Sequence, residues 1–483
     1  MSILSVPFLA FLLVLAIIYH IAPKKTKPYV ILAGNIFFFL QFDYRYSFFL
    51  LFSIVTVYAA TMLMEKLNAV KAKKAVLSIT LILNIGVLFF VKYVPWLLGL
   101  ADEVLPFDAS NFASKIIVPV GISFYTLQIC GYMVDVYRGK YAAEKNIFKF
   151  ASFSSFFPLM LQGPISRYDQ LADQLWCQAK REEIYHNFTY GAQLMLWGFL
   201  QKLVIADRAA MAANAVFSAE SEHHGIAVIF GILCYTIQIY TDFSGCVDIS
   251  RGAAQLFGIN VIENFKQPYF ATSIQDFWKR WHIALSSWLR DYVYISLGGN
   301  RKGNVRKYIN MIIVFFVSGL WHGVGFHYIV WGLLQAFYQI VGALTLKPKK
   351  LLCEKLHINR ESVIYKNLQR LITFVLVNIS WVVFRADELP MAITVLKQAF
   401  TFSGGAKLVS VMDFWDIVVL AAAIAVLFFV SYYHNKGYHI RDEISKTALP
   451  VRWLIYLLAF YVVLIFGIYG PGFSSASFIY MNF

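Results

Sequence analysis

Apolar runs long enough to cross a bilayer recur along the 483-residue chain, and they constrain its fold more than any other feature. A membrane-spanning helix needs about 20 mostly apolar residues. Apolar residues make up 59% of the chain and charged residues only 14%, which excludes a disordered chain and an ordinary soluble enzyme. The sequence therefore predicts an all-α integral membrane protein. The runs lie near 2–22, 28–44, 46–64, 75–100, 115–137, 189–206, 225–243, 308–321, 325–346, 367–384, 413–433 and 452–470.

One shorter run, near 147–164, differs from the others because it contains Pro158 and ends at Gly163-Pro164. Helix breakers at membrane depth are tolerated only where surrounding protein covers the backbone. We expect this run to form a re-entrant or tilted segment that does not cross the membrane. Together the runs predict about 11–13 transmembrane or re-entrant helices.

The distribution of basic residues predicts the orientation. The formal net charge is +15, with 42 Lys and Arg against 27 acidic residues. With the N-terminus outside and alternating spans, 34 of the 42 bases fall on inner segments, as the positive-inside rule requires. The predicted outer loop 101–114 carries three acidic residues and no base. Because the bases are dispersed over several inner segments, a nucleic-acid-binding surface is excluded. The inner segments are 23–28, 65–74, 138–149, 165–188, 244–307, 347–370 and 434–452.

The chain shows no sign of processing or of division into domains. The first apolar run lacks a basic region before it and precedes PKKTK, so we expect a retained helix instead of a cleaved signal. Five cysteines, one of them Cys177, are scattered without the spacing of a metal site, and neither a disulfide framework nor a metal site is expected. Without repeats or low-complexity linkers, residues 1–483 are predicted to form a single polytopic membrane domain.

The longest inner segment contains an amphipathic stretch at 272–291. Ser273 followed by Asp276 resembles a capping box, which predicts the start of a helix. Large apolar residues, three of them Trp, fall on one side of this helix and bases on the other. His282 is predicted at the edge of the polar face. One interpretation is an interfacial helix whose histidine touches lipid headgroups.

The second interpretation of this segment is functional. Lys279, Arg280 and Arg290, together with His282, would surround the cytoplasmic mouth of a pocket that receives an anionic, phosphate-bearing donor. The following Gly298-Gly299-Asn300-Arg301 predicts a turn. It is no phosphate-binding P-loop, because the Gly-Lys-Ser/Thr element is absent.

A second histidine lies between two apolar runs, in VSGLWHGVGFHYIVWG (317–332). Gly319, Gly323 and Gly325 allow a broken helix and close backbone approach. Ser318 precedes His322 by four residues and would share its helix face. An ionisable residue at membrane depth is expensive to bury and therefore indicates function, and histidine is the commonest general base.

Two alternatives to a catalytic His322 remain open. It can be a neutral histidine held by a hydrogen bond between helices, and His327 is a nearby competitor that spacing does not exclude. Neither a nucleophile elbow of the Gly-x-Ser-x-Gly type nor a His-Glu-x-x-His zinc motif occurs, so those hydrolase classes are not supported.

Taken together, DFWKRWHIALSSWLRDYVYISLGGNR (276–301) and SGLWHG (318–323) resemble the membrane-bound O-acyltransferase family. Within it, the chain is similar to the bacterial branch typified by the alginate O-acetylation membrane protein. The motifs occur in the family's order, and their combination is specific although each is short. Supporting matches are PVGISFYTLQ (119–128), DVYRG (135–139), FFPLMLQGPI (156–165), QIYTDFSG (238–245), WG (331–332) and WVVFRA (381–386).

The resemblance implies a family core at about 119–386, flanked by N-terminal (1–114) and C-terminal (387–483) helices. It implies a ring or funnel of tilted helices around a central tunnel. The histidine of the family's Trp-His-Gly element maps onto His322, after Trp321, and that of its Arg-Trp-His element maps onto His282. Both are expected to be catalytic. Substrate contacts are expected from Lys279, Arg280, Arg290, Ser318, Trp321, Asn300 and Arg301.

The expected reaction is acetyl transfer in a bacterial cytoplasmic membrane. A thioester, acetyl-CoA, would donate from the cytoplasm, and no permanently bound cofactor is expected. His322 would act as general base, and the acceptor would be an extracytoplasmic polysaccharide, reached directly or through an SGNH-type partner enzyme. Two alternatives remain: a teichoic-acid type of D-alanyl transferase that uses a carrier-protein thioester, and a non-catalytic acyl conduit or transporter.

Overall fold

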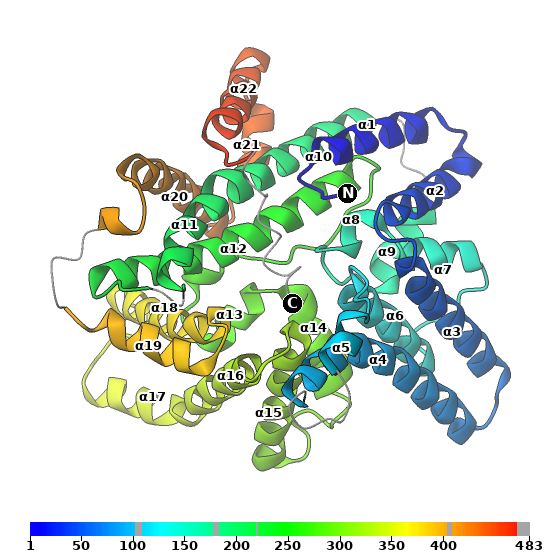
Figure 1. Ribbon diagram of the computed structural model, residues 1–483, viewed down its shortest axis with the longest axis horizontal. Coiled ribbons are helices and arrows are strands. Elements are labelled where there is room, and N and C mark those ends of the chain that lie inside the picture. Colours follow the sequence, from blue (N-terminus) through cyan, green and yellow to red (C-terminus); the bar gives the residue numbers. More distant parts are fainter. Residues whose placement is uncertain (102–108, 177–182, 219–220, 403–407, 471–483) are drawn as a thin grey trace. The chain divides into compact units, whose positions relative to one another are not determined.

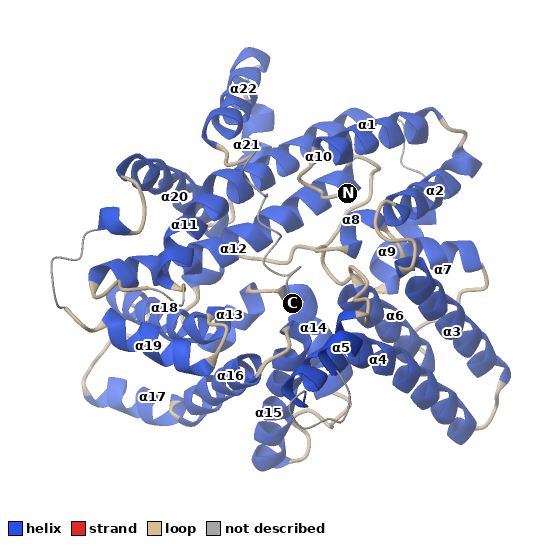
Figure 2. Ribbon diagram, in the orientation of Figure 1, coloured by secondary structure: helices blue, strands red, loops and turns tan. Residues whose placement is uncertain are grey.

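The computed structural model describes residues 1–101, 109–176, 183–218, 221–402 and 408–470, and every regular element in these ranges is helical (Figure 1, Figure 2). The predicted all-α fold is confirmed. Two features of the sequence, the acidic residues of the predicted outer loop and Cys177, lie outside the described residues.

The chain forms two compact units, which are described separately. The first comprises Met1–Met195 and Cys246–Ile262, and the second comprises Leu196–Gly245 and Glu263–Phe483. Two helices, α10 (Ile184–Phe199) and α12 (Ile226–Gln255), contribute residues to both units. The other elements of the first unit are α1 (Val6–Ile21), η1 (Lys24–Thr26), α2 (Lys27–Leu40), α3 (Tyr46–Lys66), α4 (Val70–Ala101), α5 (Ala109–Ser114), α6 (Ile122–Tyr137), α7 (Ile147–Ser154), α8 (Phe157–Met160) and α9 (Tyr168–Trp176).

In the first unit, the run 147–164 is broken as the sequence predicts. It forms α7 and the single turn α8, separated at Ser155-Phe156. Side chains from other helices bond the backbone at the break: Asn35 accepts from Phe157 N at 3.1 Å, and Gln128 donates to Phe153 O at 2.7 Å. All four groups are buried. The protein therefore supplies the hydrogen bonds that a buried helix break needs.

The second unit contains most of the motifs. Its chain alternates long helices with short, interrupted ones. Its remaining elements are η3 (Leu200–Ala206), α11 (Asp207–Val216), η4 (Pro268–Phe270), α13 (Ile274–Arg280), α14 (Ile283–Leu289), η5 (Arg290–Tyr294), α15 (Gly303–His322), α16 (Phe326–Leu344), α17 (Leu346–Lys355), α18 (Val363–Arg385), α19 (Leu389–Ala399), η6 (Leu408–Ser410), α20 (Phe414–Asn435), α21 (Ile440–Lys446) and α22 (Leu449–Phe466).

Among the described residues, six helices are long and apolar enough to cross a membrane, namely α3, α4, α12, α18, α20 and α22. A seventh candidate is the pair α16 and α17, which is bent by 44°. The other predicted runs form shorter or more polar helices, such as α6 and α10 with 16 residues each. Length and hydropathy thus establish a polytopic membrane protein. The number of 11–13 transmembrane or re-entrant helices stays a prediction.

Close packing of α15 on α16 depends on glycine. A Cβ on Gly319 would lie 2.4 Å from the Tyr328 carbonyl oxygen, and one on Gly332 would lie 2.3 Å from that of Phe315. Gly325 has φ +128°, a conformation that other residues rarely adopt. The two helices therefore form a tight hairpin (Figure 1), as the glycines of this segment predict.

Candidate active site

The segment 272–291 does not form the single interfacial helix that its pattern predicts. The predicted helix start is confirmed, since Asp276 N donates to Oγ of the N-cap residue Ser273 at 3.1 Å. The Asp276 carboxylate accepts from Thr272 N at 3.2 Å, one residue before the position that a capping box would use. The helix then stops at Arg280, and a second helix, α14, begins at Ile283. Between them His282 adopts the left-handed conformation, with φ 45° and ψ 53°. Left-handed backbone costs a non-glycine residue about 1–2 kcal/mol, so surrounding contacts must hold it.

Asn264 supplies those contacts. Its backbone oxygen accepts from Ile283 N at 3.0 Å, and its side-chain Oδ1 accepts from Ala284 N at 3.0 Å. The first amide groups of a helix lack partners within it, so Asn264 caps α14 from a distant position in the chain. This cap replaces the hydrogen bonds that a continuous helix would make. The polar-face position predicted for His282 is therefore wrong: the residue is fully buried, at 0% exposed.

The same amide fixes the tautomer of His282. Nδ1 of His282 lies 3.2 Å from Asn264 Oδ1, which is an acceptor because Ala284 N donates to it. Burial lowers the pKa of His282, which lies outside the candidate membrane spans, to about 3, so the ring is neutral at physiological pH. A neutral ring that faces an acceptor with Nδ1 carries its proton there, and Nε2 keeps a lone pair.

His322 lies beside His282. It is the last residue of α15 and is 2% exposed, and the two imidazole centroids are 6.3 Å apart with an interplanar angle of 60°. Its neighbour in the chain, Gly323, is extended and ends the helix. The broken helix predicted from the glycines is confirmed, and the histidine stands at the break.

Aromatic rings enclose both histidines. Trp331 and Trp321 each contact His322 with centroids 5.0 Å apart, and Phe384 does so at 5.5 Å. Phe243 contacts His282 edge-on at 4.8 Å. Phe243, Trp331 and Phe384 are each no more than 1% exposed. The two imidazoles are therefore surrounded by buried apolar rings that exclude bulk water, and we call this environment the histidine chamber.

Three polar groups close to the histidines make no hydrogen bond within the described part of the chain. They are Ser318 Oγ, Trp331 Nε1 and Asn264 Nδ2, and all three atoms are buried. A buried donor or acceptor left without a partner costs about 1–3 kcal/mol and needs an explanation such as a ligand. Ser318 is one helical turn before His322, as the sequence predicts, and is 1% exposed.

Of the bases predicted to contact substrate beside His282, two form ion pairs with other side chains. Arg280 pairs with Asp276 at 3.0 Å and donates to Asn435 Oδ1 at 3.1 Å. Arg290 pairs with Asp291 at 2.8 Å with its side chain 65% exposed. Lys279 is exposed at the end of α13. The structure thus brings His282, His322, Ser318 and Trp321 together, and places these three bases on the surrounding surface.

The predicted turn at Gly298-Gly299 is confirmed, because both glycines have positive φ, at 97° and 58°. Asn310, fully buried on α15, donates to Gly299 O at 2.8 Å and fixes the turn to the helix that carries His322. Asn300 and Arg301 are exposed on this turn, and the described contacts give them no place at the histidine pair.

Sequence reasoning missed three residues of the chamber wall and the cap. Phe243 lies in QIYTDFSG, Trp331 in WG and Phe384 in WVVFRA, all of which support the family resemblance, but their residue type does not distinguish them from ordinary packing residues. Asn264 is 18 residues from His282 in the chain, and no periodic pattern connects them. His327 is buried near Tyr328 in the first turn of α16, with ring centroids 4.0 Å apart. The histidine whose ring contacts His282 is His322.

The structure is that of a polytopic helical membrane protein with a buried pair of histidines, and comparisons with known proteins identify its family. Residues 142–351 match the model of MBOAT, the membrane-bound O-acyltransferase family. A probable alginate O-acetylase from Pseudomonas aeruginosa is 34% identical, over 80% of this chain and 72% of its own length. A peptidoglycan O-acetyltransferase from Helicobacter pylori is 32% identical, over 83% and 78% respectively. A teichoic acid D-alanyltransferase from Streptococcus thermophilus is 26% identical, over 48% and 58%.

The chain belongs to the membrane-bound O-acyltransferase family. It is therefore an O-acyltransferase, as its motifs predict, and a multi-pass membrane protein with bacterial relatives.

Proposed function

We propose that the protein transfers an acetyl group from cytoplasmic acetyl-CoA towards an extracytoplasmic polysaccharide, with His322 as general base. The observation that carries the proposal is the pair of buried imidazoles 6.3 Å apart, enclosed by aromatic rings and lined by unsatisfied polar groups. A dry chamber of this kind protects a thioester from hydrolysis. Relatives named as O-acetylases support the choice of acyl group.

The helix ends support different roles for the two histidines. His322 is in the last turn of α15, where the partial negative charge of the helix end favours an imidazolium. His282 is at the N-terminal end of α14, whose partial positive charge disfavours one. This difference supports His322 as the residue that takes the proton. His282, which is neutral, packs against the His322 ring and positions it.

The proposed step is a single acyl transfer. The acceptor hydroxyl oxygen attacks the thioester carbonyl carbon while His322 takes the hydroxyl proton. The carbon–sulfur bond then breaks, and the proton passes from His322 to the departing thiolate, which leaves as CoA. Ser318 Oγ and Trp331 Nε1 are buried donors near His322 that can bond the carbonyl oxygen as negative charge develops on it.

The surface bases support a cytoplasmic donor. Lys279 and Arg280 lie in the last turn of α13 and Arg290 caps the C-terminal end of α14, and phosphate-bearing CoA favours such a basic surface. With the N-terminus outside, the positive-inside rule places these bases at the cytoplasmic face. The acceptor approaches from the other face, either the polysaccharide itself or a hydroxyl on an SGNH-type partner that passes the acetyl group on.

Inside-out membrane vesicles test the proposal, because they expose the cytoplasmic face. Vesicles with the wild-type protein, incubated with acetyl-labelled acetyl-CoA, should transfer label to alkali-labile ester in the lumen. Vesicles with His322→Ala at equal expression should not. Right-side-out vesicles should also fail, since the donor cannot reach its face. Equal labelling with His322→Ala would refute the role of His322, and labelling only of right-side-out vesicles would refute the orientation.

The teichoic acid D-alanyltransferase relative favours one second candidate, D-alanyl transfer from a carrier-protein thioester. The same inside-out vesicles separate the two donors. Supplying a carrier protein loaded with labelled D-alanine should give no ester label if acetyl-CoA is the donor. Label from the carrier and none from acetyl-CoA would establish the second candidate instead.

A further inference from the structure

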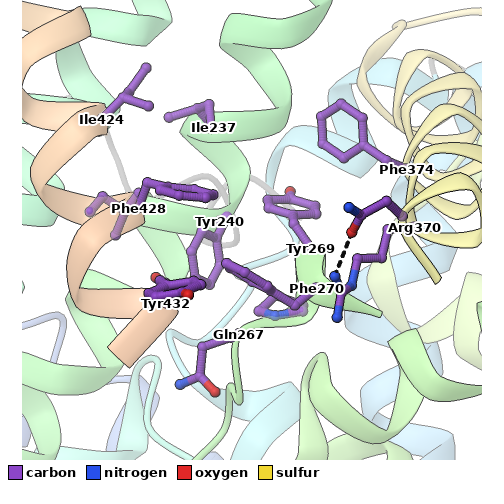
Figure 3. Close-up of a pocket in the computed structure, with 14 residues that line it drawn as sticks. Ile237, Tyr240, Gln267, Tyr269, Phe270, Arg370, Phe374, Ile424, Phe428 and Tyr432 are labelled. Atoms are coloured by element: carbon purple, nitrogen blue, oxygen red, sulfur yellow. Dashed lines mark hydrogen bonds between the residues drawn. The ribbon is translucent and has the colours of Figure 1, made fainter. Parts of the chain in front are cut away.

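A cavity of about 470 Å³ in the second unit lies between α18 and α20 (Figure 3), and none of its lining residues belongs to the histidine chamber. We name it the lateral slot. Its volume is within the range of about 300–1,000 Å³ that ligand pockets occupy. The residues that line it are Ile237, Tyr240, Gln267, Pro268, Tyr269, Phe270, Asn367, Arg370, Phe374, Ile424, Leu427, Phe428, Ser431 and Tyr432.

The lateral slot is polar at one end and apolar at the other. Along α20, Ile424 and Leu427 precede Ser431 and Tyr432, and along α18, Arg370 precedes Phe374. Figure 3 shows Ile424, Ile237 and Phe374 towards one end of the slot and Gln267 and Tyr432 towards the other. Both α18 and α20 are candidate membrane spans, so the slot lies at bilayer depth.

Arg370 is the only charged residue that lines the lateral slot, and it has no acidic partner among the described residues. Its Nη1 donates to Asn367 Oδ1 at 2.7 Å. Its Nε is buried and makes no hydrogen bond within the described part of the chain. A guanidinium with an unsatisfied buried donor, in a slot without a carboxylate, calls for an anion.

We propose that the lateral slot binds an anionic phospholipid, with its phosphate at Arg370 and one acyl chain along Ile424, Phe428 and Phe374. A lipid is the occupant that supplies both an apolar chain and an anion at this depth, and it is present in the bilayer at high concentration. Basic pockets between membrane helices bind anionic headgroups in this way. The slot is separate from the histidine chamber, so this proposal does not depend on the acyl-transfer mechanism.

The slot backs onto the turn that holds His282. Its wall residues Tyr240 and Tyr269 contact Trp281 with ring centroids 6.2 and 6.3 Å apart. Trp281 immediately precedes the left-handed His282. A lipid in the slot therefore stabilises the wall behind that turn, and binding should raise the unfolding temperature of the protein.

Native mass spectrometry of the full-length protein in detergent tests the proposal, with dioleoylphosphatidylglycerol and dioleoylphosphatidylcholine as probes. The wild type should retain the anionic lipid preferentially and gain thermal stability from it. Arg370→Gln should weaken its retention about tenfold, the loss expected for a hydrogen bond to a charged group. The matched control is Lys366→Gln on the same helix, because Lys366 already pairs with Glu361 at 2.6 Å.

A second pair of variants tests the slot independently of charge. Ile424→Trp fills the apolar end and should abolish retention of the lipid, whereas Val426→Trp, on an exposed face of the same helix, should not. Equal retention by Arg370→Gln and wild type, equal retention of both lipids by the wild type, or unchanged retention by Ile424→Trp would each overturn the proposal.

Discussion

His282 and His322 lie with their rings 6.3 Å apart at opposite kinds of helix end: His282 stands before the first turn of α14, and His322 closes the last turn of α15. Helix ends carry opposite partial charges, so the two imidazoles have different electrostatic surroundings. This relationship depends on two interruptions of helical structure, one at each histidine. It gives each residue a separate role in the proposed acyl transfer.

Replacing His322 should abolish most of the acyl transfer. A positioned general base contributes about 10²- to 10⁴-fold to the rate, so His322→Ala should lose at least about 100-fold in acetyl transfer by inside-out vesicles. His327→Ala is the matched control, since His327 is buried nearby at 8% exposed and has no proposed role. It should stay within about threefold of the wild type. A larger loss of acetyl transfer in His327→Ala than in His322→Ala would assign the general base to His327 instead.

The stability of the protein should depend on pH through His282. Burial lowers the pKa of His282 from its ordinary value of 6.5 to about 3. In the folded protein the ring therefore stays neutral when the pH falls below 6.5. The unfolded chain takes up the proton, and the folded state therefore loses stability between about pH 6.5 and 3. By pH 5 this loss is about 2 kcal/mol, and His282→Gln lacks it.

Thermal unfolding of the wild type and His282→Gln in detergent at pH 7.5 and pH 5 measures this effect. The wild type should lose its advantage in unfolding temperature over the variant as the pH falls. Comparing the two proteins at each pH cancels the titration of the other histidines. A difference that stays constant or widens towards pH 5 would contradict the buried neutral state of His282.

The helical class and the hairpin at His322 could be predicted from the sequence because local patterns determine them. Apolar runs set the membrane class, and Gly319, Gly323 and Gly325 marked the break after α15. The helix start at Ser273 was likewise predictable, because Ser273 and the Asp276 amide that it caps lie within one turn. Each of these features depends on residues close together in the chain.

The break at His282 could not be predicted in the same way. The periodicity of 272–291 is helical throughout, and the interruption comes from Asn264, which offers two acceptors to α14. The chamber wall likewise depends on contacts between distant segments, because Phe243, Trp331 and Phe384 come from three separate helices. Tertiary contacts between distant residues thus override the local pattern. They also bury a histidine that the pattern places at the surface.

Removing the cap on α14 should destabilise the protein and slow acyl transfer. Asn264→Ala leaves Ala284 N without its acceptor, at a cost of about 1–3 kcal/mol, and frees His282 to change tautomer. Asn264→Asp keeps both acceptors and should recover most of the unfolding temperature. Ser287→Ala on α14 removes only a bond from a hydroxyl to Ala284 O, and is the matched control. Equal unfolding temperatures for Asn264→Ala and Ser287→Ala would refute the capping role.

Adding one methyl group at Gly319 should displace His322, three residues further along α15. The new Cβ would lie 2.4 Å from Tyr328 O, and because this neighbour is backbone it cannot rotate away. The helices must separate, at a cost of about 1–3 kcal/mol, and a shift of about 1 Å at a catalytic group lowers rates by about 100-fold. Gly342→Ala on α16 is the control, because nothing lies within 4 Å of its Cβ, and it should gain about 0.5–1 kcal/mol. Unfolding temperature and acetyl transfer are measured for both variants. Both quantities should fall in Gly319→Ala, whereas the unfolding temperature should rise in the control Gly342→Ala. Wild-type activity in Gly319→Ala would show that the α15–α16 contact does not position His322.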